Sequence, residues 1–280
     1  MLEDAFGDIV GKARFGKGWS TGDLARRIDC LEEQIERLEQ GAAPTDEEIE
    51  RLAATLGLDS RKLADIARSA WGPLRRDPIP MLRSIDGRIG NYPVNGYLFF
   101  DPVMGEGVLF DTGYSPDRVI LLLQKEKIRL VALCLTHAHP DHIGGADRIH
   151  AATGTPVLLH ADEWRGKRPP AGGVFLEEGK EIMVGRYRVG HRHSPGHTPG
   201  GTTFLIEPMG DLREPIAFVG DALFAGSLGR AQSPETYPLL LRSVREAILS
   251  LPKETRLFPG HGPPTTVGEE RDHNPFFTDK

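Results

Sequence analysis

A break in the hydrophobic pattern divides this sequence into two parts of different character. The stretch from Trp71 to Pro80 contains three prolines and cannot continue a helix, because proline lacks an amide hydrogen and clashes with the preceding turn. Before this stretch, apolar residues recur at helical spacing; after it, short β-type runs alternate with helical patterns. The break therefore predicts a small all-α domain at 1–72, a linker at 73–85 and an α/β layered domain at 86–280.

The first part predicts four or five short helices. Thr45 and Glu48 have the spacing of a capping box, and Gly41 and Gly57 stand where helix C-termini would end. In the second part, strands are expected at 97–100, 107–110, 130–135, 157–160, 202–206 and 216–219, and helices at 115–125, 143–152 and 234–250. This alternation predicts sheets that are covered by helices.

Composition excludes several classes of function. The 34 basic and 40 acidic residues give a formal charge of −6, which disfavours a general polyanion binder. The acidic start leads into no apolar stretch, and no apolar run is long enough to span a bilayer. We therefore expect a soluble, cytoplasmic protein without a membrane partner. Cys30 and Cys134 form no CxxC pair, so histidine must carry any transition-metal chemistry.

The motif with the clearest chemistry follows the apolar run 130–135. It reads Thr136-His137-Ala138-His139-Pro140-Asp141-His142 and places three imidazoles and one carboxylate within six residues. A loop at the end of a strand can turn all four side chains into one space. Nitrogen and carboxylate oxygen together suit zinc, iron or manganese.

Three more isolated candidate ligands follow in loops after predicted strands. They are His197 in Pro195-Gly196-His197-Thr198-Pro199, Asp221 in Gly220-Asp221-Ala222, and His261 in Pro259-Gly260-His261-Gly262-Pro263. The flanking glycines and prolines fix turns and let the backbone approach a site closely. Seven candidate ligands are too many for one tetrahedral ion and suit two ions that share a bridge.

This ligand pattern resembles the metallo-β-lactamase-fold hydrolases, over about Tyr92 to Phe277. The resemblance implies an αββα sandwich and two divalent ions, zinc above all, with iron or manganese as alternatives. It places His137, His139 and His197 at the first ion, Asp141, His142 and His261 at the second, and Asp221 as the bridge. Asp141 would also orient the nucleophile, which these metals supply because they lower the pKa of bound water.

Within that superfamily, three stretches resemble the short bacterial form of glyoxalase II. They are Thr198-Pro199-Gly200-Gly201, the stretch from Gly220 through Arg230, and the ending that runs from Pro259 through Asn274-Pro275-Phe276. The resemblance implies a metal-dependent hydrolase that cleaves a hydroxyacylglutathione-like thioester or a related small ester. Persulfide dioxygenases, which use one iron held by two histidines and an aspartate, resemble the pattern too and remain an alternative.

Three further residues are candidates for supporting roles. Asp111, in Phe110-Asp111-Thr112-Gly113, resembles the family aspartate that orients a ligand imidazole from behind. His193 lies on the strand that leads to His197, where we expect it to pack near the site without binding metal. Arg230 follows Asp221 in the chain, and its guanidinium would meet a substrate carboxylate.

The helical part, over 20–67, resembles the helix-turn-helix domain of Cro-type repressors in its hydrophobic spacing and turn placement. Its third helix would enter the DNA groove, yet this stretch carries Glu32, Glu33, Glu36 and Glu39 against Arg37 alone. Because these carboxylates would repel phosphates, the sequence favours a lid, a docking element or a homodimer interface. A metabolite-sensing DNA-binding regulator with a degenerate enzyme domain is the alternative from a different class. We also expect a chain that begins near Asp77 to stay soluble and to keep metal.

Overall fold

The computed structural model describes residues 2–165 and 168–278 of the chain. Five helices come first: α1 (Phe6–Gly16), α2 (Thr21–Arg27), α3 (Glu32–Glu39), α4 (Asp46–Leu56) and α5 (Ser60–Ala67). The capping box of Thr45 and Glu48 forms as expected, and Gly57 ends α4 in the left-handed region at φ 77°. Strand β1 begins at Leu82, inside the stretch that the sequence predicts as a linker.

Two six-stranded sheets follow. The first sheet has the order β1 (Leu82–Ile89), β2 (Tyr92–Asp101), β3 (Glu106–Phe110), β4 (Arg129–Cys134), β5 (Val157–Leu159) and β6 (Gly173–Phe175). The second has the order β14 (Thr265–Thr266), β13 (Arg256–Pro259), β10 (Ile216–Gly220), β9 (Thr202–Ile206), β8 (Tyr187–His193) and β7 (Ile182–Val184). A short hairpin, β11 (Leu223–Phe224) with β12 (Ser227–Leu228), stands apart from both.

The remaining helices lie between these strands or, for α10, after the last of them. They are α6 (Pro116–Glu126), α7 (Pro140–Ile143), α8 (Ala146–Thr153), α9 (Tyr237–Ala247), α10 (Val267–His273) and the short 3-10 helices η1 (Ala161–Trp164) and η2 (Pro234–Thr236). No helix in residues 2–165 or 168–278 is long and apolar enough to cross a membrane.

The strand periodicity explains the layers. Along β3, Val108 and Phe110 belong to the core between the two sheets, whereas Leu109 packs into a second core with Val119 and Leu123 of α6. Along β10, Phe218 faces the first sheet, whereas its two neighbours face the opposite way. Because each sheet is buried on both faces, its central strands are continuous apolar runs. The result is the expected αββα sandwich preceded by helices.

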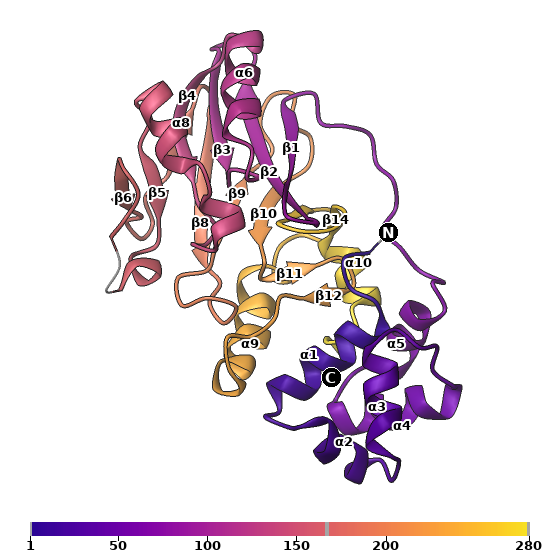
Figure 1. Cartoon of the computed structure of the whole chain (residues 1–280). Helices are drawn as coiled ribbons and strands as arrows, with labels where there is room; N and C mark the ends of the chain where they lie inside the picture. The colour runs from indigo at the N-terminus through magenta and orange to yellow at the C-terminus, as the bar shows by residue number, and fades with distance from the viewer. Residues whose placement is uncertain (1, 166–167, 279–280) are drawn as a thin grey trace.

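The third core joins the N-terminal helices to the sandwich. Ile9, Leu52 and Leu63 of the helical part share one buried cluster with Val219 of β10 and Leu240 of α9. Figure 1 shows helices α1 to α5 gathered at the end of the molecule that carries α9 and the β11–β12 hairpin. The helical part therefore covers apolar surface of the second sheet layer.

The acidic helix α3 is already engaged within the helical part. Glu39 accepts hydrogen bonds from the guanidinium of Arg14 at 2.6 and 2.7 Å, and Glu32 accepts one from the Thr21 hydroxyl at 2.5 Å. Five helices agree with the expected number. Whether they act as a helix-turn-helix domain or form a dimer interface stays a prediction.

Candidate metal centre

The histidine motif lies at the end of a central strand. Strand β4 runs parallel to both β3 and β5, and its carboxyl end delivers the chain to Thr136 and His137. His139 is the residue before helix α7, with extended backbone angles, and Pro140 occupies the first helical turn, a position that needs no amide hydrogen. The turn of α7 then brings Asp141 and His142 back toward the same space.

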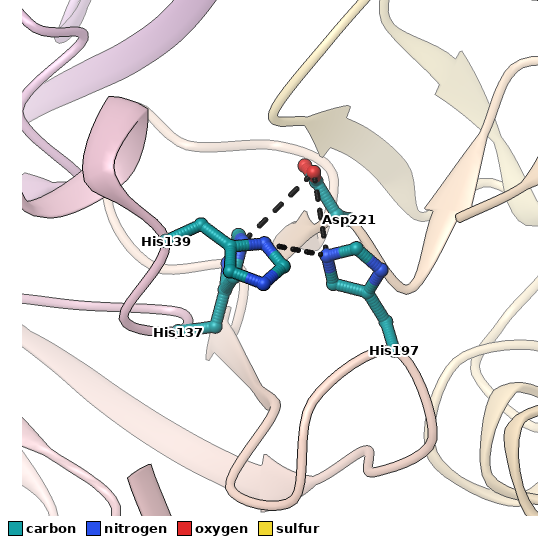
Figure 2. A group of neighbouring side chains, drawn as sticks. All are labelled: His137, His139, His197 and Asp221. Carbon is teal, nitrogen blue, oxygen red and sulfur yellow. Dashed lines mark hydrogen bonds and ion pairs between the residues drawn. The ribbon is translucent and has the colours of Figure 1, made fainter. Parts of the chain in front are cut away.

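The first group consists of His137, His139, His197 and Asp221, whose ligand atoms all lie within 4.8 Å of one another. Nδ1 of His139 is 3.1 Å from Nε2 of His137 and 3.0 Å from Nε2 of His197. Oδ2 of Asp221 is 3.6 Å from Nε2 of His197. Figure 2 shows the three imidazoles and the carboxylate turned toward one another, with His137 and His139 on one loop and His197 and Asp221 on two others.

The second group consists of Asp141, His142 and His261. Nε2 of His261 is 3.2 Å from Oδ2 of Asp141, and Nε2 of His142 is 3.7 Å from the same oxygen. Asp221 reaches this group as well, because its Oδ1 is 3.3 Å from Nε2 of His142 and its Oδ2 is 3.4 Å from Nε2 of His261. The carboxylate of Asp221 therefore lies between the two groups.

Two buried atoms at this junction lack a hydrogen-bond partner. They are Nε2 of His142 and Oδ1 of Asp221, which face each other at 3.3 Å without the geometry of a hydrogen bond. Burial and the neighbouring His142 also lower the pKa of His137 well below its usual value, which keeps this imidazole in the neutral form that binds metal. The donor set, the convergence and the orphaned atoms fit divalent metal ions.

The second group holds protons tightly in the absence of metal. Burial opposes the change, yet the carboxylates of Asp221 and Asp111 raise the pKa of His142 well above its usual value. Against the same effect of burial, Asp141 and Asp221 raise the pKa of His261 to about 10. Cationic imidazoles and anionic carboxylates thus balance one another there. A metal ion would replace those protons, since ligand histidines must be neutral.

Asp111 lies directly behind the site. Its Oδ2 is 2.8 Å from Nδ1 of His142, and its two oxygens accept from the amide and hydroxyl of Thr136 at 2.8 and 2.7 Å. This contact turns Nε2 of His142 toward Asp221, which is the geometry that an orienting aspartate requires; its role toward a bound metal stays a prediction. Backbone carbonyl oxygens hold two other candidate ligands in the same way. That of Pro93 lies 2.6 Å from Nδ1 of His261, and that of Arg230 lies 2.8 Å from Nδ1 of His197.

Glycines make room for these contacts. A Cβ at Gly260 would lie 2.3 Å from Oδ1 of Asp221 and 2.4 Å from Cε1 of His142. Gly220 takes φ 51°, and a Cβ there would lie 2.4 Å from the Thr136 hydroxyl oxygen. Both glycines precede a candidate ligand, so their small size is a geometric requirement of the site.

Glu163 contributes to the site without a signal in the sequence. This buried carboxylate accepts from the amide of Ala138 at 2.9 Å and from the amide of Gly200 at 2.7 Å. It therefore ties the loop of His137 and His139 to the loop of His197. No motif marks Glu163, because its two partners are backbone amides that only the folded chain brings beside it.

The other two supporting candidates lie farther out. The exposed ring of His193 stacks on His160 with centroids 4.2 Å apart, and its Nε2 is 2.9 Å from the carbonyl oxygen of Pro199. It thus touches the loop of His197 without joining either ligand group. The exposed guanidinium of Arg230 lies 4.4 Å over the ring of Phe15. Its role toward a substrate stays a prediction.

Comparison with known proteins agrees with this geometry. Residues 89–261 match the profile described as "Metallo-beta-lactamase superfamily", which is more than half of the chain. The chain belongs to the metallo-beta-lactamase superfamily. It is a superfamily hydrolase with candidate metal-binding His/Asp clusters, and helices α1 to α5 lie outside the matched residues.

Two curated relatives show a similar coverage. "Probable metallo-hydrolase YqgX" of Bacillus subtilis (strain 168) is 29% identical over 208 residues, which are 67% of this chain and 94% of the relative. "Hydroxyacylglutathione hydrolase GloC" of Haemophilus influenzae (strain ATCC 51907 / DSM 11121 / KW20 / Rd) is 29% identical over 190 residues, which are 61% of this chain and 87% of the relative.

Solved structures share the fold. BLEG-1 B3 metallo-beta-lactamase has a TM-score of 0.61 and 33% identity, and the match covers 71% of this chain and 100% of that one. TTHA1623 in a di-iron-bound form has a TM-score of 0.54 and 33% identity, covering 69% and 100%. ETHE1 from Myxococcus xanthus has a TM-score of 0.58 and 25% identity, covering 69% and 83%. The fold binds divalent metals, while the metal of this chain is not established.

Proposed function

We propose that this chain hydrolyses a small thioester, of the hydroxyacylglutathione type, or a related ester, with two divalent metal ions. The observation that carries the proposal is the position of Asp221 between two ligand groups, with His197 at 3.6 Å on one side and His142 at 3.3 Å on the other. The relative named hydroxyacylglutathione hydrolase supports the substrate class.

The metals would be held by the seven candidate ligands, with His137, His139 and His197 at one ion, Asp141, His142 and His261 at the other, and Asp221 shared. When bound, they would polarise a carbonyl group and lower the pKa of water to near neutrality. Zinc is the proposed ion, and the di-iron form of TTHA1623 makes iron the first alternative to test.

This centre is open to solvent at Asp141, His197 and His261, whose side chains are partly exposed. The side chain of Asp141 is 20% exposed, whereas His142 and His137 are 0% and 2% exposed. Although burial opposes it, His261 and His142 lower the pKa of Asp141, so this group stays a carboxylate at neutral pH. It is thus placed to accept a hydrogen bond from an attacking water and to orient it.

A thioester fits the chemistry of the residues. A thiolate leaves as a weaker base than an alkoxide or an amide, since a thiol has a pKa near 8.5. Departure of the thiolate therefore needs little help from an acid of the protein.

The test is thiol release from S-lactoylglutathione by protein loaded with zinc, manganese or iron, together with the metal content per chain. We expect about two ions and release of one thiol per thioester. Asp221→Ala should lose both, whereas Asp211→Ala, an exposed aspartate in a distant turn, should keep both.

Metal-loaded protein that cleaves no thioester or ester would refute the proposal. One iron per chain with oxygen uptake on a glutathione persulfide would replace it with the persulfide dioxygenase alternative.

A further inference from the structure

We propose that helix α1 and the residues before it support the metal centre. Lys12 is the positioning residue, and it fixes the loops that carry the candidate ligands. The inference rests on the proposed metal-dependent function and adds to it a requirement for residues outside the superfamily match, which begins at residue 89.

Lys12 fastens the hairpin that follows the candidate bridging ligand. Its ammonium donates to the carbonyl oxygen of Leu228 at 2.7 Å and pairs with the carboxylate of Asp4. Asp4 in turn accepts from the hydroxyl of Ser227 at 2.5 Å. The two charged side chains are 16% and 9% exposed, so the pair is shielded from solvent. Both hairpin partners belong to β12, six and seven residues after Asp221.

One path leads from Lys12 to the second ligand group. The ammonium lies 4.8 Å over the centroid of the Phe224 ring. Phe224 meets the imidazole of His261 edge to face, with centroids 5.7 Å apart and planes at 89°. The Phe224 ring therefore lies in contact with both the ammonium and the candidate ligand, and its position limits the rotation of His261.

A second path leads from α1 to the first ligand group. Beyond Leu228, where β12 ends, the chain continues to Arg230, whose guanidinium lies 4.4 Å over the ring of Phe15. The carbonyl oxygen of Arg230 is 2.8 Å from Nδ1 of His197. That contact directs Nε2 of His197 toward the first group, and outer contacts of this kind set the orientation of a metal-binding imidazole.

The helix that carries Lys12 is itself fixed. Ile9, Val10 and Ala13 of α1 are fully buried in the core shared with the second sheet. A Cβ at Gly16 would lie 2.3 Å from the ring of Tyr237, so the end of α1 packs directly on the start of α9. A helix that only covered the apolar surface of the sheet would need apolar contacts alone. Helix α1 also places the shielded Lys12 ammonium on the carbonyl oxygen of Leu228 in the β11–β12 hairpin.

The test is the metal affinity of Lys12→Met, which removes the ammonium and keeps most of the side-chain length. Zinc affinity is measured by competition with a chromophoric chelator, without substrate. We expect a dissociation constant about tenfold larger than that of the unchanged chain, the low end of the range for losing a direct outer contact of a ligand, because Lys12 acts through Leu228 and Phe224. Lys12→Arg, which keeps the positive charge and its donors, should recover most of the affinity.

The matched control is Lys17→Met at the end of the same helix, where the exposed ammonium lies 5.6 Å from the centroid of the Trp19 ring; its zinc affinity should not change. Unfolding of the metal-free variants is measured in parallel. A lower unfolding midpoint of Lys12→Met with unchanged zinc affinity would overturn the proposal, because it would show a structural role alone.

If Lys12→Met does not fold, Phe15→Leu tests the path to His197 in the same assay, and unchanged affinity there would overturn the proposal. The proposed function fails separately, when metal-loaded unchanged chain releases no thiol or alcohol.

Discussion

Glu163 offers a quantitative test of how the metal loops are held. Its carboxylate accepts one hydrogen bond from Ala138 and one from Gly200, and a hydrogen bond to a charged group contributes about 1.5–3 kcal/mol. Glu163→Gln keeps one acceptor oxygen and turns an amide group toward the other N–H. We therefore expect the free energy of unfolding of the metal-free chain to fall by about 2 kcal/mol.

The same change should weaken metal binding. Ala138 lies between the candidate ligands His137 and His139, so a shift of the Ala138 amide moves both imidazoles. We expect the affinity for metal to fall about 10-fold, as it does when outer contacts of a ligand are lost. Urea unfolding and chelator competition measure the two effects. The control is Glu181→Gln, because the ion pair of Glu181 with the 64% exposed Arg188 is a surface pair worth about 0–1 kcal/mol. Unchanged stability and zinc affinity in Glu163→Gln would refute the reasoning.

Three further outcomes follow from the structure. Asp221→Ala should lower metal content and abolish hydrolysis while circular dichroism shows the helices intact; full activity would remove Asp221 from the site. The shared core reverses the expectation from the sequence for a chain that begins at Asp77: it should aggregate in light scattering, because the apolar face under α1 becomes exposed. A monodisperse, metal-binding fragment would instead support the separable domain that the proline-rich stretch predicts. Burial raises the pKa of Glu270 to about 7, above its ordinary 4.5. The contribution of this side chain to the free energy of unfolding is therefore fully present below pH 4.5 and is lost as the pH rises to 7. The stability of the unchanged chain relative to Glu270→Gln should therefore fall by about 3 kcal/mol between pH 4.5 and 8, and a difference independent of pH would contradict this.

The sequence alone determined the layers and the candidate ligands. Runs such as 107–110 and 216–219 contain no polar side chain, and such runs are typical of strands that are buried on both faces. The ligand motif is local, because a strand end and a one-turn helix suffice to gather its side chains. Strand β1 was missed since, among its eight residues, only Ile85 is buried, and such a strand has no apolar run.

Only the tertiary structure decided how the loops are held and where the N-terminal helices pack. Glu163 and Lys12 act on backbone groups that lie 25, 37 and 216 positions away, and a backbone amide or carbonyl leaves no mark in the sequence. The proline-rich stretch predicts a separate helical unit, yet α1 shares a core with β10 and α9. Which apolar face packs on which is set by shape and total burial over the whole chain, and periodicity reports only that a face exists.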